Sequence, residues 1–145
     1  MSIGDMSAVR PRLSAPPRFR LVATPRSRAL AAPAAFALLA VAAVHLVDGP
    51  GSLSDQFYIG ALELALAIAC VPLAVALLAC PLPALWHAAG ALCSAALLMF
   101  VASRTVGLPG STDDIGNWGQ LLGVVNVLFE VLVVGLAAAA LRRRA

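Results

Sequence analysis

Long apolar runs separated by polar segments predict helices that cross a membrane. The runs cover residues 29–47, 57–79, 84–103 and 120–141. A helix of about 20 residues spans the roughly 30 Å of hydrocarbon in a bilayer. The hydrophobic content of 61% and the charged content of 12% agree with this, since a soluble domain carries roughly twice that charge. We therefore expect an all-α fold, a four-helix transmembrane bundle within residues 28–141.

The N-terminal segment, residues 1–27, differs from the rest of the chain in composition. It is rich in arginine, serine and proline and has no apolar period, which predicts a disordered tail. The apolar run behind these basic residues also fits a secretory signal peptide. We favour a membrane-spanning helix, because the run is long for a signal peptide, carries His45 near its end and precedes three further runs.

Three polar segments connect the predicted helices. Residues 48–56 contain glycine, proline and serine and predict a turn-rich loop. The connection at residues 80–83 is so short that the second and third helices must form an antiparallel hairpin. Residues 104–119 form the longest connection, and loops of this length are often functional. Thr112 before two acids predicts a short helix there, with Trp118 as an anchor at the membrane surface.

The arginines lie almost entirely on one side of the predicted membrane. With the N-terminus in the cytoplasm, six arginines precede the first span and three follow the last, whereas Arg104 alone lies outside. Cytoplasmic segments of membrane proteins carry an excess of basic residues. This bias predicts a bacterial plasma membrane protein with both termini in the cytoplasm, residues 142–145 being a basic end. The tails carry the excess positive charge, which indicates lipid as the partner and no nucleic acid.

Five polar residues in or next to the spans are the candidates for function. An ionisable side chain costs roughly 2.5–3.5 kcal/mol at the centre of a membrane helix, so such residues are the first place to look. His45, Glu63, Asn126 and Glu130 all fall in the outer half of the predicted bundle, and Arg104 lies at its outer rim. Asn126 and Glu130 are one helical turn apart and share a face.

These side chains are compatible with several roles. A buried carboxylate carries protons or binds a small ligand, and Arg104 is placed to pair with Glu63. His45, Glu63 and Glu130 are the only plausible metal set, since imidazole and carboxylate both bind divalent ions. Alternatively, the polar groups only hydrogen-bond between helices and fix their packing. We expect no cofactor, and nothing favours an enzyme, because the sequence has no nucleophile elbow or phosphate-binding loop.

Small residues predict where the helices approach one another closely. Gly119 and Gly123 lie on the same face of the fourth span as Glu130, and Ala61 and Ala65 form a stripe on the second span. Such stripes also favour an alternative function, in which the chain is a structural or accessory subunit of a homo-oligomer or of a larger membrane complex. A subunit of a redox-associated membrane enzyme is a third possibility.

The residues from Ser103 to Gly110, SRTVGLPG, precede an acid, a tryptophan and a helix with a central glutamate. In this order they resemble uncharacterised small four-helix membrane proteins of actinobacterial type. The resemblance implies the four-helix topology and no particular activity. The chain is also similar in size to the DoxX-like quinone-associated membrane proteins, without a shared motif.

The function that the sequence favours is therefore carried by a polar site within the bundle. We expect a small multi-pass protein of the plasma membrane that handles a proton, an ion or a small ligand. The site lies in the outer half of the predicted bundle, so the ligand would reach it from outside the cell.

Overall fold

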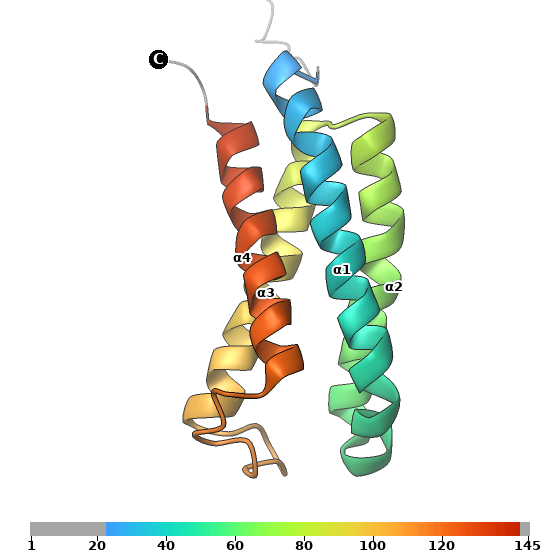
Figure 1. Ribbon diagram of the computed structural model, residues 1–145. Coiled ribbons are helices and arrows are strands. Elements are labelled where there is room, and N and C mark those ends of the chain that lie inside the picture. Colours follow the sequence, from blue (N-terminus) through green and yellow to red (C-terminus); the bar gives the residue numbers. More distant parts are fainter. Residues whose placement is uncertain (1–22, 143–145) are drawn as a thin grey trace, which may run out of the picture.

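The computed structural model describes residues 23–142, and within them it is all helical apart from turns and one loop. Four helices follow one another along the chain (Figure 1). All four are long and apolar enough to cross a membrane, so the predicted four-helix bundle is confirmed. Their bounds are α1 Pro25–Asp55, α2 Phe57–Ala79, α3 Pro83–Thr105 and α4 Leu121–Leu141.

Helix α1 begins earlier than the sequence predicts. The Thr24 side chain accepts a hydrogen bond from the Ser27 backbone, and the Ser27 side chain accepts one from the Thr24 backbone. This capping box satisfies two backbone donors that a helix start otherwise leaves free, and Pro25 fits the first turn because it has no donor to lose. Residues 25–27, predicted as part of a disordered tail, are therefore helical. The rest of that tail, residues 1–22, lies outside the described residues.

The predicted loop at residues 48–56 is wrong, because α1 continues as a helix to Asp55. Pro50 lies inside the helix and removes a single backbone donor, and the Ser52 hydroxyl donates to the Asp48 carbonyl at 3.4 Å. With 31 residues, α1 is about 46 Å long at 1.5 Å per residue, longer than the hydrocarbon core. Gln56 alone separates α1 from α2.

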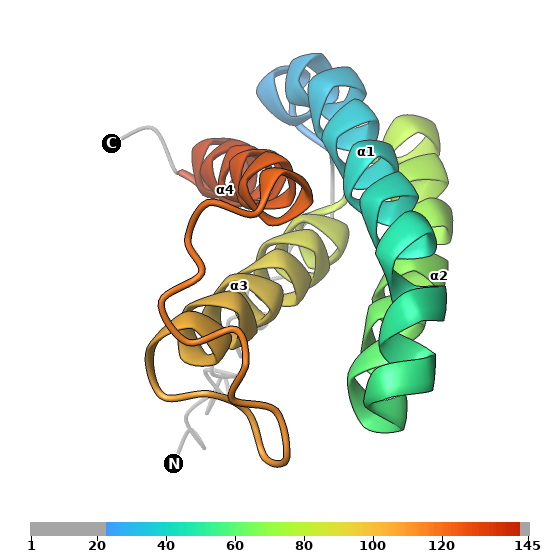
Figure 2. The same ribbon diagram turned by 60° about the horizontal axis from the view of Figure 1, so that its bottom comes forward.

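The four helices form two pairs that separate toward one end. Helix α1 packs most extensively on α2, α3 packs on α4, and α1 also contacts α4, whereas the contact between α2 and α3 is the smallest of the four. Helices α2 and α3 are antiparallel, as the short connection at residues 80–83 requires, but they are not a closely packed hairpin (Figure 1). Seen from the end that carries the long loop, α3 and α4 diverge from α1 and α2 (Figure 2).

The core consists largely of small side chains, which allow the helices to approach closely. On α2 the buried positions are Gly60, Ala67, Cys70, Ala74 and Leu77. The predicted stripe of Ala61 and Ala65 is therefore not the buried face of this helix, and Ala65 is exposed. The fully or nearly fully buried small residues elsewhere are Ala31, Ala34, Ala35, Ala37, Ala42, Ala89, Cys93 and Ala137.

The glycines of the fourth span take different roles. An added Cβ at Gly123 would lie 2.9 Å from the Phe100 ring, so this residue permits contact between α4 and α3. Gly119 instead lies in the loop before α4, and a Cβ there would meet nothing within 4 Å. The predicted packing role of Gly119 is therefore wrong, because this residue precedes α4, which begins at Leu121, and does not lie on its face.

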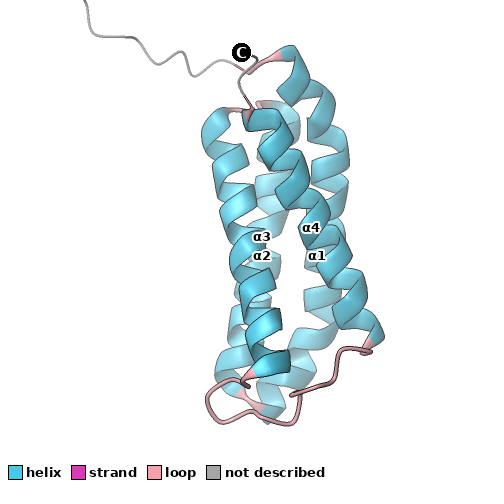
Figure 3. Cartoon of the chain, turned by 90° about the vertical axis from the view of Figure 1, so that its left-hand side faces the viewer, coloured by secondary structure: helices cyan, strands magenta, loops and turns pink. Residues whose placement is uncertain are grey.

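The loop of residues 106–120 lies across one end of the bundle (Figure 3). We call this the loop end, and we call the opposite end, with the connection at residues 80–82, the turn end. The short helix predicted near Thr112 does not form, and turns occupy this stretch instead. Leu108 and Ser111 exchange two backbone hydrogen bonds of 2.8 Å around Pro109 and Gly110. Gly110 has φ +74°, which is the conformation that a proline-glycine turn needs at its second central residue.

Candidate functional site

A cavity of about 810 Å³ lies at the loop end, where the two helix pairs separate. All four helices and the loop contribute to its wall. Ligand sites of membrane and soluble proteins are commonly concave and of this volume. We call it the loop-end cavity. Its lining includes the five predicted site residues, His45, Glu63, Arg104, Asn126 and Glu130, so the structure brings them to one place.

Acidic side chains gather in this wall. The chain contains seven acidic residues in all. The six that the structure describes all line the loop-end cavity, and the seventh, Asp5, lies outside the described residues. Arg104 is the only arginine that lines the cavity among the described residues. The six acids are Asp48, Asp55, Glu63, Asp113, Asp114 and Glu130.

His45, Asn126 and Glu130 form the most deeply buried polar cluster of the cavity wall, which we call the polar trio. The Asn126 amide nitrogen donates to Glu130 Oε1 at 2.8 Å, within one face of α4. The same nitrogen lies 3.0 Å from His45 Nε2 on α1. Because the amide nitrogen is a donor, His45 Nε2 is placed to accept this hydrogen bond. His45 Nε2 also lies 3.6 Å from Glu130 Oε1, so the trio links α1 to α4.

Three oxygen atoms of this wall have no hydrogen-bond partner among the described residues. They are Glu130 Oε2, Asn126 Oδ1 and Glu63 Oε2. Glu130 is 1% exposed and Asn126 is 7% exposed, so water at the protein surface does not satisfy them. A buried acceptor without a donor costs about 1–3 kcal/mol, and more when it is charged. All three atoms accept hydrogen bonds, so a group that donates can complete this part of the wall. The wall's other buried atoms without a hydrogen-bond partner, Arg104 Nε and Nη1, belong to the guanidinium group that pairs with Asp114.

Glu63 lines the same cavity from α2, the helix that packs on α1. Its carboxyl group lies beside the Ser52 hydroxyl and close enough to Asp48, His45 and Asp114 for their charges to act on it. The ion pair between Arg104 and Glu63 that the sequence suggested does not form. Arg104 pairs instead with Asp114, because the loop folds back over the end of α3.

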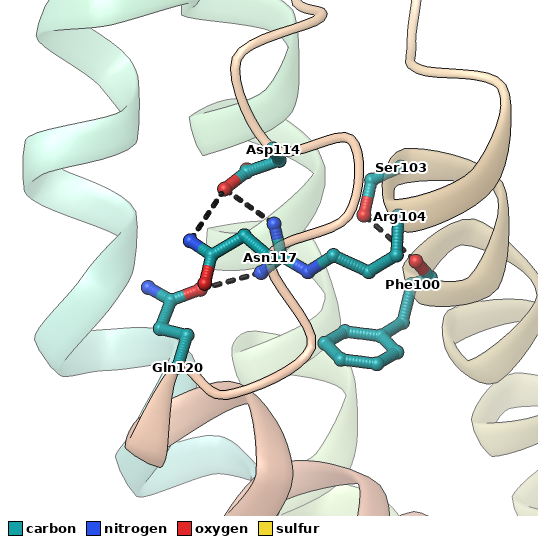
Figure 4. A network of polar contacts seen from close by, with 6 residues as sticks. All are labelled: Phe100, Ser103, Arg104, Asp114, Asn117 and Gln120. Carbon is teal, nitrogen blue, oxygen red and sulfur yellow. Dashed lines mark hydrogen bonds and ion pairs between the residues drawn. The ribbon is translucent and has the colours of Figure 1, made fainter.

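An ion pair and a hydrogen bond of Arg104 attach the loop to α3. Its guanidinium group forms an ion pair with Asp114 and donates to the Gln120 side chain, as Figure 4 shows. The Phe100 ring lies under the guanidinium, with 5.0 Å from its centre to Arg104 Cζ. Although Arg104 is a cation within the cavity wall, Asp114 neutralises its charge. The remaining carboxylates therefore have no arginine partner among the described residues.

Two hydrogen bonds also attach the loop to the other helix pair. The Tyr58 hydroxyl on α2 donates to the Pro109 carbonyl at 2.7 Å, and the Gln56 side chain donates to the Gly110 carbonyl at 2.6 Å. Both acceptors belong to the proline-glycine turn. The loop thus bridges the two helix pairs across the mouth of the cavity.

The metal set suggested by the sequence is not assembled. Within residues 23–142 no three histidine, cysteine or acidic side chains are close enough together to hold a metal ion. His45 and Glu130 are neighbours, but Glu63 does not complete a ligand group with them. The free cysteines do not add a ligand either, since Cys70 and Cys93 are buried in the apolar core and Cys80 lies at the turn end.

The cavity wall also has polar residues that are not among the five predicted site residues. They include Asp48, Asp55, Asp113, Asp114 and Gln120; the sequence pattern predicts only a helix start at Asp113 and Asp114 and places Gln120 in the fourth span. The sequence does indicate that these acids belong together, because they and the intramembrane glutamates all fall at the same end of the predicted spans. What the sequence does not give is that the loop folds over the helix ends and brings its acids to the wall.

We compared the chain with models of protein families, with curated proteins and with solved structures. None of the three comparisons finds a match. The function must therefore be argued from the loop-end cavity itself.

Proposed function

We propose that the protein binds a small cationic ligand with hydrogen-bond donors, such as a protonated amine, in the loop-end cavity. In this proposal the protein lies in a bacterial plasma membrane, both termini are cytoplasmic and the cavity opens to the outside. The single observation that carries the proposal is Glu130 Oε2, a buried acceptor without a donor in a wall that holds all six described acids.

Electrostatics supports a cation over an anion or a neutral molecule. Carboxylates that share a site repel one another, and this repulsion is stronger where protein and lipid exclude water. The amine would reduce the repulsion and donate to the acceptors of Glu130, Asn126 and Glu63. An anionic ligand would meet only Arg104, which already pairs with Asp114.

The size of the cavity supports a molecule rather than a bare proton. A proton on Glu130 would neutralise one carboxylate and leave a cavity of about 810 Å³ without an occupant. A divalent metal is not favoured, because the described residues do not assemble three ligands.

The proposal is tested by thermal unfolding of the full chain in lipid nanodiscs. Ethylammonium and acetate serve as a cationic and an anionic probe of similar size. A ligand that binds the folded state alone stabilises it by about 2.7 kcal/mol at one hundred times its Kd. We therefore expect a saturable rise of the melting temperature with ethylammonium and none with acetate.

Two variants locate the binding. Glu130→Gln and Glu63→Gln each remove a negative charge without changing the shape of the side chain, so each should weaken ethylammonium binding. Asp5→Asn removes an acid outside the described residues and should leave the binding unchanged. If ethylammonium shifts the wild type and both glutamine variants equally, the proposed site is wrong, and an accessory subunit becomes the better interpretation.

A further inference from the structure

The loop-end cavity has an opening on the side where α2 and α3 face each other. These two helices are the neighbours that touch least, whereas α1 and α4 close the opposite side. Four exposed residues lie along this opening and also line the cavity, namely Leu62 and Ala65 of α2 and Ala95 and Met99 of α3. All four lie inside helices that are apolar enough to span a membrane. The opening therefore faces lipid hydrocarbon rather than water.

Toward the turn end, the same gap continues as an apolar groove of about 520 Å³. Small side chains of both helices make room for it, and none of its lining residues is charged. Leu92 lines both the groove and the loop-end cavity, so the two spaces are neighbours along α3. The lining residues of the groove are Ala69, Pro72, Leu73, Ala76, Leu85, Ala88 and Leu92.

We propose that the ligand is an amphiphile of the membrane, with a protonated amine head and an alkyl tail, that enters sideways between α2 and α3. This inference rests on the proposed function and adds the class of ligand. The head reaches the carboxylates and the polar trio, and the tail lies in the apolar groove. From Glu63 to Pro72 the axis of α2 rises about 13 Å, a distance that a medium-length alkyl chain covers.

The division of polar and apolar residues along the gap carries the argument. The acids lie in the loop-end half, where Glu130 Oε2 and Asn126 Oδ1 need a donor. The other half of the gap offers methyl and methylene groups alone, which pack against a chain but give a second polar group no partner. An amphiphile with a phosphate or carboxylate head is excluded by the same wall of acids. A water-soluble amine would leave the groove side of the gap unused.

The test uses the full chain in phosphatidylcholine nanodiscs, with dodecylammonium and ethylammonium as probes. Dodecanoate controls for the sign of the head charge. Ala88→Phe places a ring in the groove, and Ala91→Phe is the matched control, since Ala91 is exposed on the same helix but lines neither space. Binding is read from the probe concentration at half of the maximal thermal shift, and nanodiscs without protein correct for partition into lipid.

We expect saturable binding of dodecylammonium and none of dodecanoate. Because the lipid is itself apolar, the groove contributes van der Waals packing to the alkyl tail rather than a hydrophobic gain. Ala88→Phe should therefore weaken the binding of dodecylammonium about threefold to tenfold. The same variant should leave the binding of ethylammonium unchanged, and Ala91→Phe should change the binding of neither probe. Glu130→Gln and Glu63→Gln should each weaken the binding of both amines.

Two results overturn the inference, and they are distinguishable. If both phenylalanine variants bind dodecylammonium as the wild type does while ethylammonium still binds, the tail does not lie in the groove and the proposed cation site stands. If neither amine gives a saturable shift in the wild type, the cation site itself is wrong and the amphiphile fails with it.

Discussion

Asn126 illustrates how one side chain sets the chemistry of the loop-end cavity. Its amide nitrogen serves both His45 and Glu130, so two buried acceptors on different helices share a single donor group. The amide oxygen and the second carboxylate oxygen remain without partners. The trio therefore fixes the position of Glu130 and leaves one face of it ready to accept from a ligand.

These different roles predict that substitution of Asn126 lowers stability, whereas substitution of Glu130 weakens ligand binding and leaves stability nearly unchanged. Asn126→Leu leaves His45 Nε2 and Glu130 Oε1 without their donor, so the free energy of unfolding should fall by about 0.5–2 kcal/mol. Glu130→Gln retains an oxygen that accepts from Asn126, and its stability should stay within about 0.5 kcal/mol of the wild type. Thermal unfolding without ligand measures both. Equal stability of the two variants would show that the hydrogen bonds of the trio do not hold α1 to α4.

A close contact at Gly60 leaves no room for a larger residue at this position. An added Cβ would lie 2.3 Å from the Leu53 backbone nitrogen, because the end of α1 folds directly against the start of α2. Gly60→Ala should therefore lower the free energy of unfolding by about 1–3 kcal/mol. Gly135→Ala is the control, since a Cβ at Gly135 meets nothing within 4 Å and alanine favours the helix. A Gly60→Ala melting temperature as high as that of Gly135→Ala would contradict the close approach.

At the scale of elements, the apolar runs were sufficient to predict four helices but not their ends at the loop end. The pattern Asp48-Gly-Pro-Gly indicates a turn when only neighbouring residues are considered. In the structure this stretch is helical and its Leu53 lies directly against Gly60 of α2, a contact that the sequence pattern does not report. The pairing of Asn126 with Glu130 was predictable from helical spacing. Their meeting with His45 depends on which helices are neighbours, and spacing along one helix does not contain that information.

The ion pair between Asp114 and Arg104 attaches the loop of residues 106–120 to the bundle. Asp114 pairs with Arg104, so Asp114→Asn weakens the attachment of the loop to α3. Deuterium uptake of the loop amides should rise in this variant while uptake of the four helices stays unchanged. Asp113→Asn is the matched control, because no hydrogen bond or ion pair joins Asp113 to another described residue. Equal uptake in the two variants would show that the ion pair does not order the loop.

The whole molecule is electrically asymmetric along the bundle axis. The start of α1 and the end of α4 lie at the turn end (Figure 1). The first carries Arg26 and Arg28 and the second is followed by Arg142, whereas the six described acids line the loop-end cavity. In a bacterial plasma membrane the basic side faces the cytoplasm. The asymmetry therefore supports an orientation in which the loop-end cavity opens outward. It also agrees with a site that receives a cation from outside or from the outer leaflet.

This orientation predicts which cysteine a membrane-impermeant maleimide reaches in intact cells. Cys80 is native, exposed and located at the turn end, whereas Cys70 and Cys93 are buried. In a Ser111→Cys variant the new thiol lies in the loop, and it should be labelled without permeabilisation. Cys80 should be labelled only after the cells are permeabilised, and Cys80→Ser in the same background assigns the signal. Labelling of Cys80 alone in intact cells would reverse the orientation, and the acidic cavity would then face the cytoplasm.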